Sequence, residues 1–374
     1  LACSEVQPIK SSSSAIGIGL FEHIVATRSR NRRIVPQQYS VTALPRRSFS
    51  PPRRRKAMDY TRSKMEYTDF IDEWNNGSEH ITAHTSGSTG TPKPIHLLKS
   101  DMLRSANATI KRFGLDKNCV IASLLPISSI ATKMAIVRSI AAGCRYINLH
   151  PSNDFEIPEH IDLLSVGPSQ CDCLIAHPDM AQQIRVLLVG GAELSLKRRD
   201  ALLALGYDLY ESYGMTETCS NVALRHGADD FFEANEGINF CLDNRSCIVV
   251  EAPAYGFDGT ITNDIAVLQA PDRFRLLGRY DNVINSGGLK IHPEQLEREL
   301  APLLDIPFYI VGVPDDKWGQ SVAIVIEGSQ DDAQKASNRL EILTDGRKRP
   351  KRVIAMAEFE RTSSGKIKRN ITVR

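Results

Sequence analysis

From residue 81 onward, short apolar runs alternate with segments of helical periodicity, and this alternation limits the fold more than any other feature of the sequence. Ser100 and Ser195 precede two of the predicted helices and are predicted N-caps. Alternating strands and helices build an α/β domain with a largely parallel sheet, whose ligands gather at the carboxyl ends of the strands. Strands are predicted at 81–83, 120–125, 146–149, 161–166, 185–189 and 208–210, and helices at 101–113, 130–142 and 196–205.

The pattern changes after Asn221, where β-rich segments replace the alternation. We find no internal repeat in the chain. The sequence predicts a large N-terminal α/β domain over 58–281, with a mostly parallel sheet, and a small, mobile C-terminal α+β domain over 282–374. In this second half, strands are predicted at 246–250, 259–266, 273–277, 309–313 and 322–327, and a helix at 293–303.

Residues 1–57 differ in composition from the rest of the chain. They carry eleven Lys and Arg against two acidic residues, a net charge of +9, which leaves −7 for the remainder because the whole chain carries +2. Arg-rich, Ser-rich and acid-poor composition is typical of an organelle transit peptide, and the alternative is upstream sequence with Met58 or Met65 as the natural start. In either case we expect a disordered basic leader, because the segment has too little apolar content to fold. The mildly acidic remainder gives no support to a nucleic-acid partner.

The eight cysteines form no Cys-x-x-Cys pair, and Cys171-x-Cys173 has no second Cys/His cluster at zinc spacing. We therefore expect reduced core thiols, which favour a cytoplasmic protein. No apolar run approaches the ~20 residues that a membrane-spanning helix needs, so no membrane partner is predicted. The sequence leaves the oligomeric state open.

A segment rich in Ser, Thr and Gly begins at His84 and reads His-Thr-Ser-Gly-Ser-Thr-Gly-Thr-Pro-Lys-Pro through Pro94. Its backbone N–H groups can converge on an anion, its hydroxyls can donate hydrogen bonds, and Lys93 adds a positive charge. The spacing differs from that of the Walker P-loop. A flexible surface turn has the same composition, so the segment by itself does not separate a turn from a phosphate site.

Five further segments whose residues could bind a ligand or take part in a reaction follow in order along the chain. Paired glycines in the first let a backbone lie flat against a ligand. The second offers an aromatic ring, hydroxyls and a carboxylate, and the third places an acid at a predicted strand end. Each segment alone has an ordinary explanation as a turn, a core aromatic residue or a surface charge. The segments are Val189-Gly190-Gly191-Ala192-Glu193, Tyr213-Gly214-Met215-Thr216-Glu217-Thr218, Thr262-Asn263-Asp264, the turn 278–282 with the glycine segment 286–291, and 361–369.

Taken together and in this order, the six segments resemble the adenylate-forming superfamily of acyl-CoA synthetases, adenylation domains and luciferases, over about residues 80 to 370. The resemblance implies an enzyme with a two-step reaction. A carboxylate attacks the α-phosphate of ATP and releases pyrophosphate, and a thiol then takes the acyl group from the acyl-adenylate. ATP, Mg²⁺ and coenzyme A are the implied cofactors, and a small-molecule carboxylic acid is the implied substrate.

The same resemblance implies roles for single residues. Lys366 matches the catalytic lysine that stabilises charge during adenylation, and Asp281 matches the hinge on which the small domain rotates. Glu217 is expected to hold Mg²⁺ and, with Thr216, to be catalytic. The β- and γ-phosphates are assigned to Thr85, Ser86, Gly87, Ser88, Thr89, Gly90 and Lys93, the adenosine to Gly191, Ala192, Glu193, Tyr213, Asp264 and Arg279, and the CoA loop to Gly287, Gly288 and Lys290.

Within the superfamily, the short chain and the segments between 278 and 294 are most similar to the o-succinylbenzoate–CoA ligases of menaquinone biosynthesis. That acid keeps a second carboxylate after activation, and a buried anion needs a cationic partner. The helix at 130–142 carries Lys133 and Arg138, whose spacing places them on different faces, so only one is expected to reach the substrate. The alternative is that both are solvated helix charges. Ser129, Gly190 and Gly214 complete the predicted substrate side.

The chain also departs from the superfamily pattern. Asn263 stands where a glycine is usual, Ser129 where many members carry an aromatic residue or His, and Thr132 where glycine is frequent. The part that precedes the phosphate segment is short. Two alternatives therefore stay open within the enzyme class, another acyl- or aryl-CoA synthetase and an adenylation enzyme that loads a carrier protein. A third is a truncated homologue that binds nucleotide without turnover.

Overall fold

The computed structural model describes residues 66–84, 93–340, 346, 348–361 and 367–369. The predicted leader 1–57, the phosphate segment from Thr85 to Gly90 and the predicted catalytic Lys366 lie outside the described residues. The described part begins with a helix over 66–75.

One large sheet forms the centre of the N-terminal part. Its strands are β3 (Val120–Ser123), β4 (Arg145–Asn148), β5 (Ile161–Val166), β6 (Ile184–Val189), β7 (Leu209–Met215), β8 (Ser220–His226), β9 (Phe232–Ala234), β10 (Asn239–Leu242), β11 (Cys247–Glu251), β12 (Thr260–Ala270) and β13 (Arg273–Arg279). They lie in the order β10-β11-β12-β13-β9-β8-β7-β6-β5-β3-β4. The strands from β4 to β7 are parallel, and those from β7 to β10 are antiparallel.

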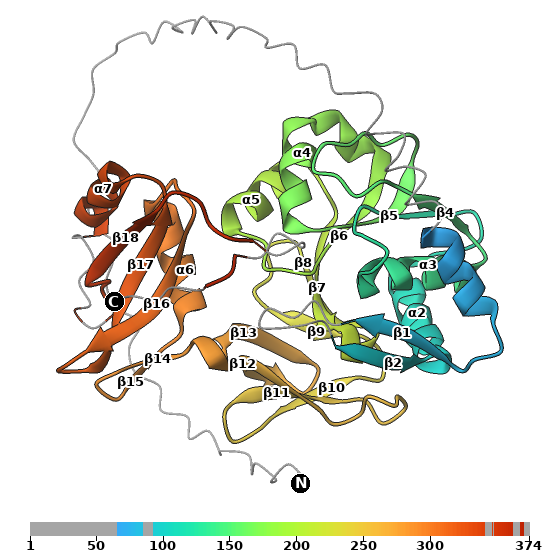
Figure 1. The fold of residues 1–374 in the computed structure, drawn as a ribbon. Coiled ribbons are helices and arrows are strands. Elements are labelled where there is room, and N and C mark those ends of the chain that lie inside the picture. The colour runs from blue at the N-terminus through green and yellow to red at the C-terminus, as the bar shows by residue number, and fades with distance from the viewer. Residues whose placement is uncertain (1–65, 85–92, 341–345, 347, 362–366, 370–374) are drawn as a thin grey trace, which may run out of the picture. The chain divides into compact units, whose positions relative to one another are not determined.

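Helices cover both faces of the parallel half (Figure 1). Leu174 of α4 (Cys171–Ala176) and Leu202 of α5 (Leu196–Ala204) pack against one face, and Phe113 of α2 (Lys99–Phe113) and Ala135 of α3 (Ile130–Ala142) pack against the other. Burial on both faces explains why these strands are continuous apolar runs rather than alternating ones. The short 3₁₀ helices are η1 (Pro168–Gln170), η2 (Pro178–Gln183), η3 (Thr216–Thr218) and η4 (Tyr280–Asn282). None of the helices in the described ranges is long and apolar enough to cross a membrane.

The predicted α/β class is confirmed, and the large sheet is mixed rather than mostly parallel. Strands β8 to β13 follow one another through short turns, which can reverse the chain but cannot carry it across a sheet face as a parallel connection requires. The predicted strand at 81–83 is also placed differently. It lies in β1 (His80–His84), which pairs only with β2 (Pro94–Leu98) in a separate antiparallel hairpin.

The two serines predicted as N-caps differ in outcome. Ser195 accepts a hydrogen bond from the Arg198 N–H at 3.4 Å, as an N-cap does. The prediction for Ser100 is wrong, because α2 begins at Lys99 with Leu98 at the N-cap position. Strand β2 pairs with β1 up to Leu98, and the helix follows at the next residue without a loop. The helix therefore begins earlier than the sequence suggests.

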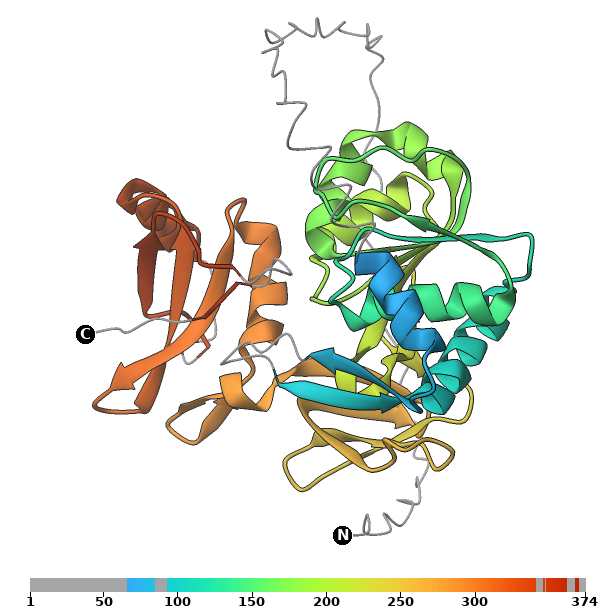
Figure 2. The same ribbon diagram turned by 45° about the vertical axis from the view of Figure 1, so that its right-hand side comes forward.

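The C-terminal part forms a second sheet of five strands. Two helices, α6 (Pro293–Leu300) and α7 (Gln330–Leu340), accompany this sheet (Figure 2). Leu300 of α6 and Ala336 of α7 pack on one face of the sheet, and Phe359 packs on the other. The predicted small α+β unit is therefore present. Its elements are β14 (Ile284–Ser286), β15 (Leu289–Ile291), α6 (Pro293–Leu300), η5 (Ala301–Leu303), β16 (Phe308–Asp315), β17 (Gly319–Glu327), α7 (Gln330–Leu340) and β18 (Arg352–Met356).

Candidate active site

The carboxyl ends of β6 and β7 carry glycines where the strands lie closest. A Cβ atom at Gly190 would overlap the side chain of Ser212, and one at Gly214 would overlap the backbone carbonyl of Ser220. A side chain at Gly214 would force β7 and β8 apart, and one at Gly190 would require the Ser212 hydroxyl to move. Gly214, predicted on the substrate side, is therefore also required by strand packing, while Gly191 takes a left-handed φ of 83° that a glycine adopts without strain.

A tight turn follows β7 and carries Thr216 and Glu217 on η3. The Thr218 hydroxyl accepts a hydrogen bond from the Met215 N–H at 3.1 Å and fixes the turn. Cys219 and Ser220 take left-handed φ values of 53° and 79°, a strained conformation that is common at functional sites. Thr216 is buried and Glu217 is half-buried, so the turn holds one hydroxyl and one carboxylate in fixed places.

The metal expected at Glu217 fits a single protein carboxylate. Among the residues that the structure describes, no group of three His, Cys, Asp or Glu side chains could hold a metal ion. Mg²⁺ is usually bound through one or two carboxylates together with substrate phosphates and water. The described donor set therefore suits a metal that arrives with a nucleotide.

Tyr213, Asp264 and Arg279 come together across three strands. The Tyr213 hydroxyl donates to Asp264 Oδ2 at 2.9 Å, and Arg279 Nη1 donates to Asp264 Oδ1 at 2.8 Å. Asp264 and Arg279 are direct partners in the pairing of β12 and β13. Asp264 lies inside β12 and not at a strand end, because this strand runs on to Ala270 beside a bulge at Ile265 and Ala266.

The Tyr213 ring belongs to the core beneath this network. It lies 5.0 Å from the Phe274 ring in an edge-on contact, and 7% of the residue is exposed. Burial, and next the charge of Asp264, raises the pKa of Tyr213 well above its usual value, so the phenol stays a neutral donor. Burial opposes the charge of Arg279, but Asp264 and Asp281 together raise the pKa of this guanidinium.

Arg245 and Asn263 extend the network toward the predicted hinge. Arg245 Nη1 donates to Asn263 Oδ1 at 2.9 Å, and Asn263 Nδ2 donates to Asp281 Oδ2 at 3.2 Å. The residue that replaces the usual glycine thus links β12 to η4. The sequence analysis did not single out Arg245, because its link to β12 runs through Asn263, 18 positions away, and no local pattern marks it.

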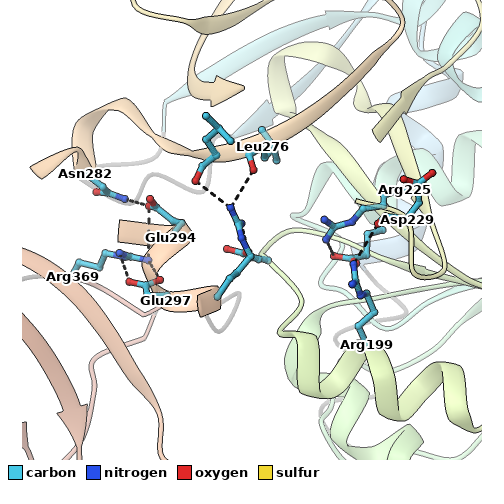
Figure 3. Close-up of polar contacts among 12 residues, drawn as sticks. Arg199, Arg225, Asp229, Leu276, Asn282, Glu294, Glu297 and Arg369 are labelled. Atoms are coloured by element: carbon cyan, nitrogen blue, oxygen red, sulfur yellow. Dashed lines mark hydrogen bonds and ion pairs between the residues drawn. The ribbon is translucent and has the colours of Figure 1, made fainter. Parts of the chain in front are cut away.

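Two residues of α6 reach the chain around the hinge (Figure 3). Glu294 Oε1 accepts a hydrogen bond from Asn282 Nδ2 at 2.5 Å. Arg298 donates to the carbonyl oxygens of Leu276 at 3.2 Å and Leu277 at 3.3 Å, and it pairs with Glu193 Oε1 at 2.9 Å. The side chain of Glu193, predicted beside adenine, is therefore engaged by α6, and sequence reasoning missed both α6 residues.

The predicted acyl side begins at the start of α3. Ser129 is the N-cap of this helix, and its hydroxyl accepts from the Ala131 N–H at 3.2 Å. Lys133 Nζ lies 3.6 Å from Glu73 Oε2, 3.4 Å from the Thr82 carbonyl oxygen and 4.7 Å from the centre of the Phe70 ring. Burial lowers the pKa of Lys133, and the charge of Glu73 opposes this shift. Lys133 of α3 therefore contacts both the helix over 66–75 and β1.

Arg138 lies on a different face of α3 from Lys133 and is buried, with 1% of the residue exposed. Its Nη2 donates to Asn221 Oδ1 on β8, and its Nε has no hydrogen-bond partner. No carboxylate among the described residues pairs with it, and burial lowers its pKa to about 10. It therefore stays protonated at neutral pH as a buried cation. The alternative that both helix cations are solvated is wrong, because Lys133 is also largely buried.

The predicted CoA loop is the tight turn between β14 and β15. Gly287 and Gly288 take left-handed φ values of 56° and 81°, and a Cβ at Gly287 would overlap the Trp318 ring. The Gly287 N–H also donates to the Trp318 carbonyl at 2.8 Å. Lys290 is exposed on β15.

The chain on both sides of residues 362–366 is held by the C-terminal sheet. Arg361 pairs with Glu327 at 2.7 Å and forms a β-bridge with Ile367. Arg369 forms two hydrogen bonds of 2.8 Å with the half-buried Glu297 of α6 (Figure 3). The two flanks that carry the predicted catalytic lysine are thus fixed by carboxylates far away in the sequence.

Comparisons with known proteins show which sequences and folds this chain is similar to. A 2-succinylbenzoate–CoA ligase from Listeria monocytogenes serotype 4b is 26% identical over 338 residues, which are 80% of this chain and 71% of that protein. An acyl-CoA synthetase (AMP-forming)/AMP-acid ligase II-like protein from Dyadobacter fermentans is 27% identical, with a TM-score of 0.54 over 81% of this chain and 91% of that one. An o-succinylbenzoate coenzyme A synthetase from Bacillus subtilis, solved with ATP and magnesium, is 19% identical, with a TM-score of 0.66 over 77% of this chain and 68% of that one.

The model of the AMP-binding enzyme family matches residues 49–250, more than half of the chain, and begins inside the predicted leader. The resemblance inferred from the six segments is confirmed. This chain belongs to the family of AMP-binding enzymes.

Proposed function

We propose that this chain is an AMP-forming ligase that joins o-succinylbenzoate to coenzyme A through an acyl-adenylate. The proposal depends most on Arg138, a buried cation that no described carboxylate neutralises. Curated relatives that cover 76–80% of the chain are named for this reaction. Adenylation followed by thioester formation is the chemistry that the ordered segments imply.

Arg138 suits the second carboxylate of this acid. An ionised guanidinium that is buried without a counter-ion is costly, and a substrate anion removes that cost on binding. Asn221 holds Nη2 of Arg138, and no protein group competes for its buried Nε. Lys133 is already engaged by Glu73, so it offers less to a substrate. The interaction selects an acid with two carboxylates over one with a single carboxylate.

The nucleotide side uses the Tyr213, Asp264 and Arg279 network. Each carboxylate oxygen of Asp264 accepts one protein hydrogen bond and keeps capacity for a ribose hydroxyl. Tyr213 and Arg279 hold that carboxylate in one orientation before the nucleotide binds, so little ordering is needed on binding. Gly191 and Ala192 would flank the adenine, and Lys93 with the hydroxyls before it would hold the terminal phosphates.

Chemistry at the α-phosphate is assigned to Thr216 and Lys366. Thr216 would donate to an α-phosphate oxygen, and Lys366 would bridge the attacking carboxylate and that phosphate as negative charge spreads. Bound Mg²⁺, held by Glu217 and the phosphates, would supply further charge neutralisation. The chain is anchored before and after the segment that carries Lys366, at Arg361 and at Arg369.

Thioester formation would use the turn at Gly287 and Gly288 after rotation about Asp281. The space beside Gly288 is open and leaves room for a narrow thiol arm, whereas the Trp318 ring fills the space beside Gly287. Lys290 adds a positive charge for coenzyme A. The hinge, the domain boundary near residue 281, the choice of CoA over a carrier protein and the cytoplasmic location stay predictions.

The test is a pyrophosphate-release assay with ATP, Mg²⁺ and a panel of acids. o-Succinylbenzoate is compared with 4-oxo-4-phenylbutanoate, which has the same chain and ring but lacks the ring carboxylate. We expect kcat/KM to favour the dicarboxylate by about 100-fold, the worth of one charge-assisted pair. Equal rates would indicate another acyl-CoA synthetase. No release with any acid by folded protein would favour the truncated homologue, and release without thioester formation on CoA would favour a carrier-protein acceptor.

A further inference from the structure

Cys119 and Cys144 lie side by side at the amino ends of β3 and β4, away from the candidate active site. The two strands pair in parallel with Val120 opposite Arg145, so the residues just before them are also opposite each other. The Arg145 N–H donates to the Cys119 carbonyl at 3.3 Å, which extends the pairing to these positions. Neighbouring strands lie about 4.8 Å apart, within the Cα separation of about 4.4–6.8 Å that a disulfide spans.

The two thiols also lie on the same face of the sheet. Cys119 and Cys144 both pack against the cluster that contains Phe113 and Ile121. Side chains directly opposite each other on paired strands stand on one side of the sheet, and the shared cluster agrees with this. Both cysteines are free thiols and half-buried, so a small reagent can reach them.

We propose that Cys119 and Cys144 form a thiol oxidation site, which exchanges with a low-molecular-weight disulfide such as oxidised glutathione to form a protein disulfide. The Cys119 thiolate attacks one glutathione sulfur, forms a mixed disulfide and releases one glutathione thiolate. The Cys144 thiolate then attacks the Cys119 sulfur and releases the second glutathione. Two protein thiols are oxidised, one glutathione disulfide is reduced to two thiols, and the two protons pass to the released thiolates.

The surroundings of Cys144 favour Cys119 as the first nucleophile. At Cys119, the Asp116 N–H donates to Sγ at 3.4 Å and the thiol itself donates to Asp116 Oδ1 at 3.5 Å. Burial, and next the neighbouring Cys119, raises the pKa of Cys144 to about 11, so this thiol ionises less readily and acts second. Cys171, on α4, is fully buried and is therefore poorly placed for exchange.

The bond would join the edge strand β4 to β3 and close the segment that contains α3. Such a link reduces the freedom of the unfolded chain and so stabilises the folded one. The candidate site lies at the carboxyl ends of the parallel strands, and the two cysteines lie at the amino ends. We therefore expect oxidation to raise the melting temperature and to leave pyrophosphate release intact.

The experiment treats the full chain with oxidised glutathione, blocks remaining thiols by alkylation and identifies tryptic peptides by mass spectrometry. Cys119 and Cys144 fall in different peptides, 118–133 and 139–145. We expect these two peptides to be cross-linked, a higher melting temperature, and reversal of both by a reductant. The Cys144→Ser variant should instead keep glutathione on Cys119, and the Cys119→Ser variant should show little adduct on Cys144.

The Cys173→Ser variant is the matched control, because it removes a buried thiol on α4 and should leave the cross-link unchanged. Alkylation of both Cys119 and Cys144 after oxidation would overturn the proposal. A cross-link from either of them to a third cysteine would overturn it as well.

Discussion

The two sides of the candidate active site differ in how their charges are compensated. On the nucleotide side, Asp264 is paired with Arg279 and accepts from Tyr213, and Asp281 is paired with Arg279. On the acyl side, Arg138 is buried and has a neutral amide, Asn221, as its hydrogen-bond partner. The first set is complete without ligand, and the second lacks an anion among the described residues.

This difference indicates two ways to recognise a ligand. A paired carboxylate is held rigid before binding and offers its spare lone pairs to hydroxyl groups at little cost in order. An unpaired buried cation instead destabilises the empty protein and gains most when an anion arrives. We expect the nucleotide side to control affinity and the acyl side to control which acid is accepted.

The largest expected effect lies between the two sides, at the reacting atoms. Lys366→Ala should slow adenylation by about 10²–10³-fold, since a positioned charge at a developing anion is worth roughly 3–4 kcal/mol. Conversion of supplied acyl-adenylate and CoA into thioester should change little, because no carboxylate attacks the α-phosphate in that step and the charge that Lys366 stabilises does not develop. Single-step assays of both half-reactions measure this split, and equal losses in both would remove Lys366 from the mechanism.

The next effect distinguishes the two cations of α3. Arg138→Met should lower kcat/KM for o-succinylbenzoate by about 100-fold and reduce the preference for the dicarboxylate, because a charge-assisted pair is lost. Removal of an uncompensated buried charge should leave the melting temperature unchanged or higher.

Lys133→Met is the matched variant on the same helix. It breaks the contact with Glu73 and the Thr82 carbonyl and should lower the melting temperature while the preference between the two acids stays the same. If this variant, and not Arg138→Met, abolishes the preference, the assignment of the acyl side is reversed.

A smaller effect is expected on the nucleotide side. Asp264→Asn should raise KM for ATP by about tenfold, because a neutral amide cannot accept from Tyr213, Arg279 and the ribose together. Asp208→Asn is the control, since Asp208 pairs with the exposed His226 at the start of β7, far along the strand from the site. A KM for ATP that is unchanged in Asp264→Asn would contradict the ribose assignment.

The smallest effect is expected from the basic leader. A chain that starts at Met58 should have the same melting temperature and the same rate of pyrophosphate release, because residues 1–57 have charge and serine but little apolar content. Thermal melting and pyrophosphate release measure the two properties. A large drop in the melting temperature would show that the leader packs on the rest of the chain.

Much of the fold followed from local pattern. The helix at 130–142 was predicted with its observed ends, because Ser129 caps it and Gly143 follows in a left-handed conformation. The strand at 161–166 was also predicted correctly, because burial on both faces leaves a continuous apolar run. The strands β11, β12 and β13 were predicted, but their antiparallel pairing in the large sheet and the separate β1–β2 hairpin were missed, because strand order depends on pairings between distant residues.

For the site, motif order predicted which residues matter but not how they contact one another. The sequence by itself determined the family, the glycines after β6 and β7, and the presence of Asp264 and Arg279, because these are fixed by residue type and spacing. Only the tertiary structure decided that β12 and β13 pair in the register that joins Asp264 to Arg279. It also decided that Glu73 neutralises Lys133 while Arg138 has no carboxylate partner in the described chain. Charge compensation depends on three-dimensional neighbours, and neighbours that are 60 or more positions apart leave no trace in local sequence pattern.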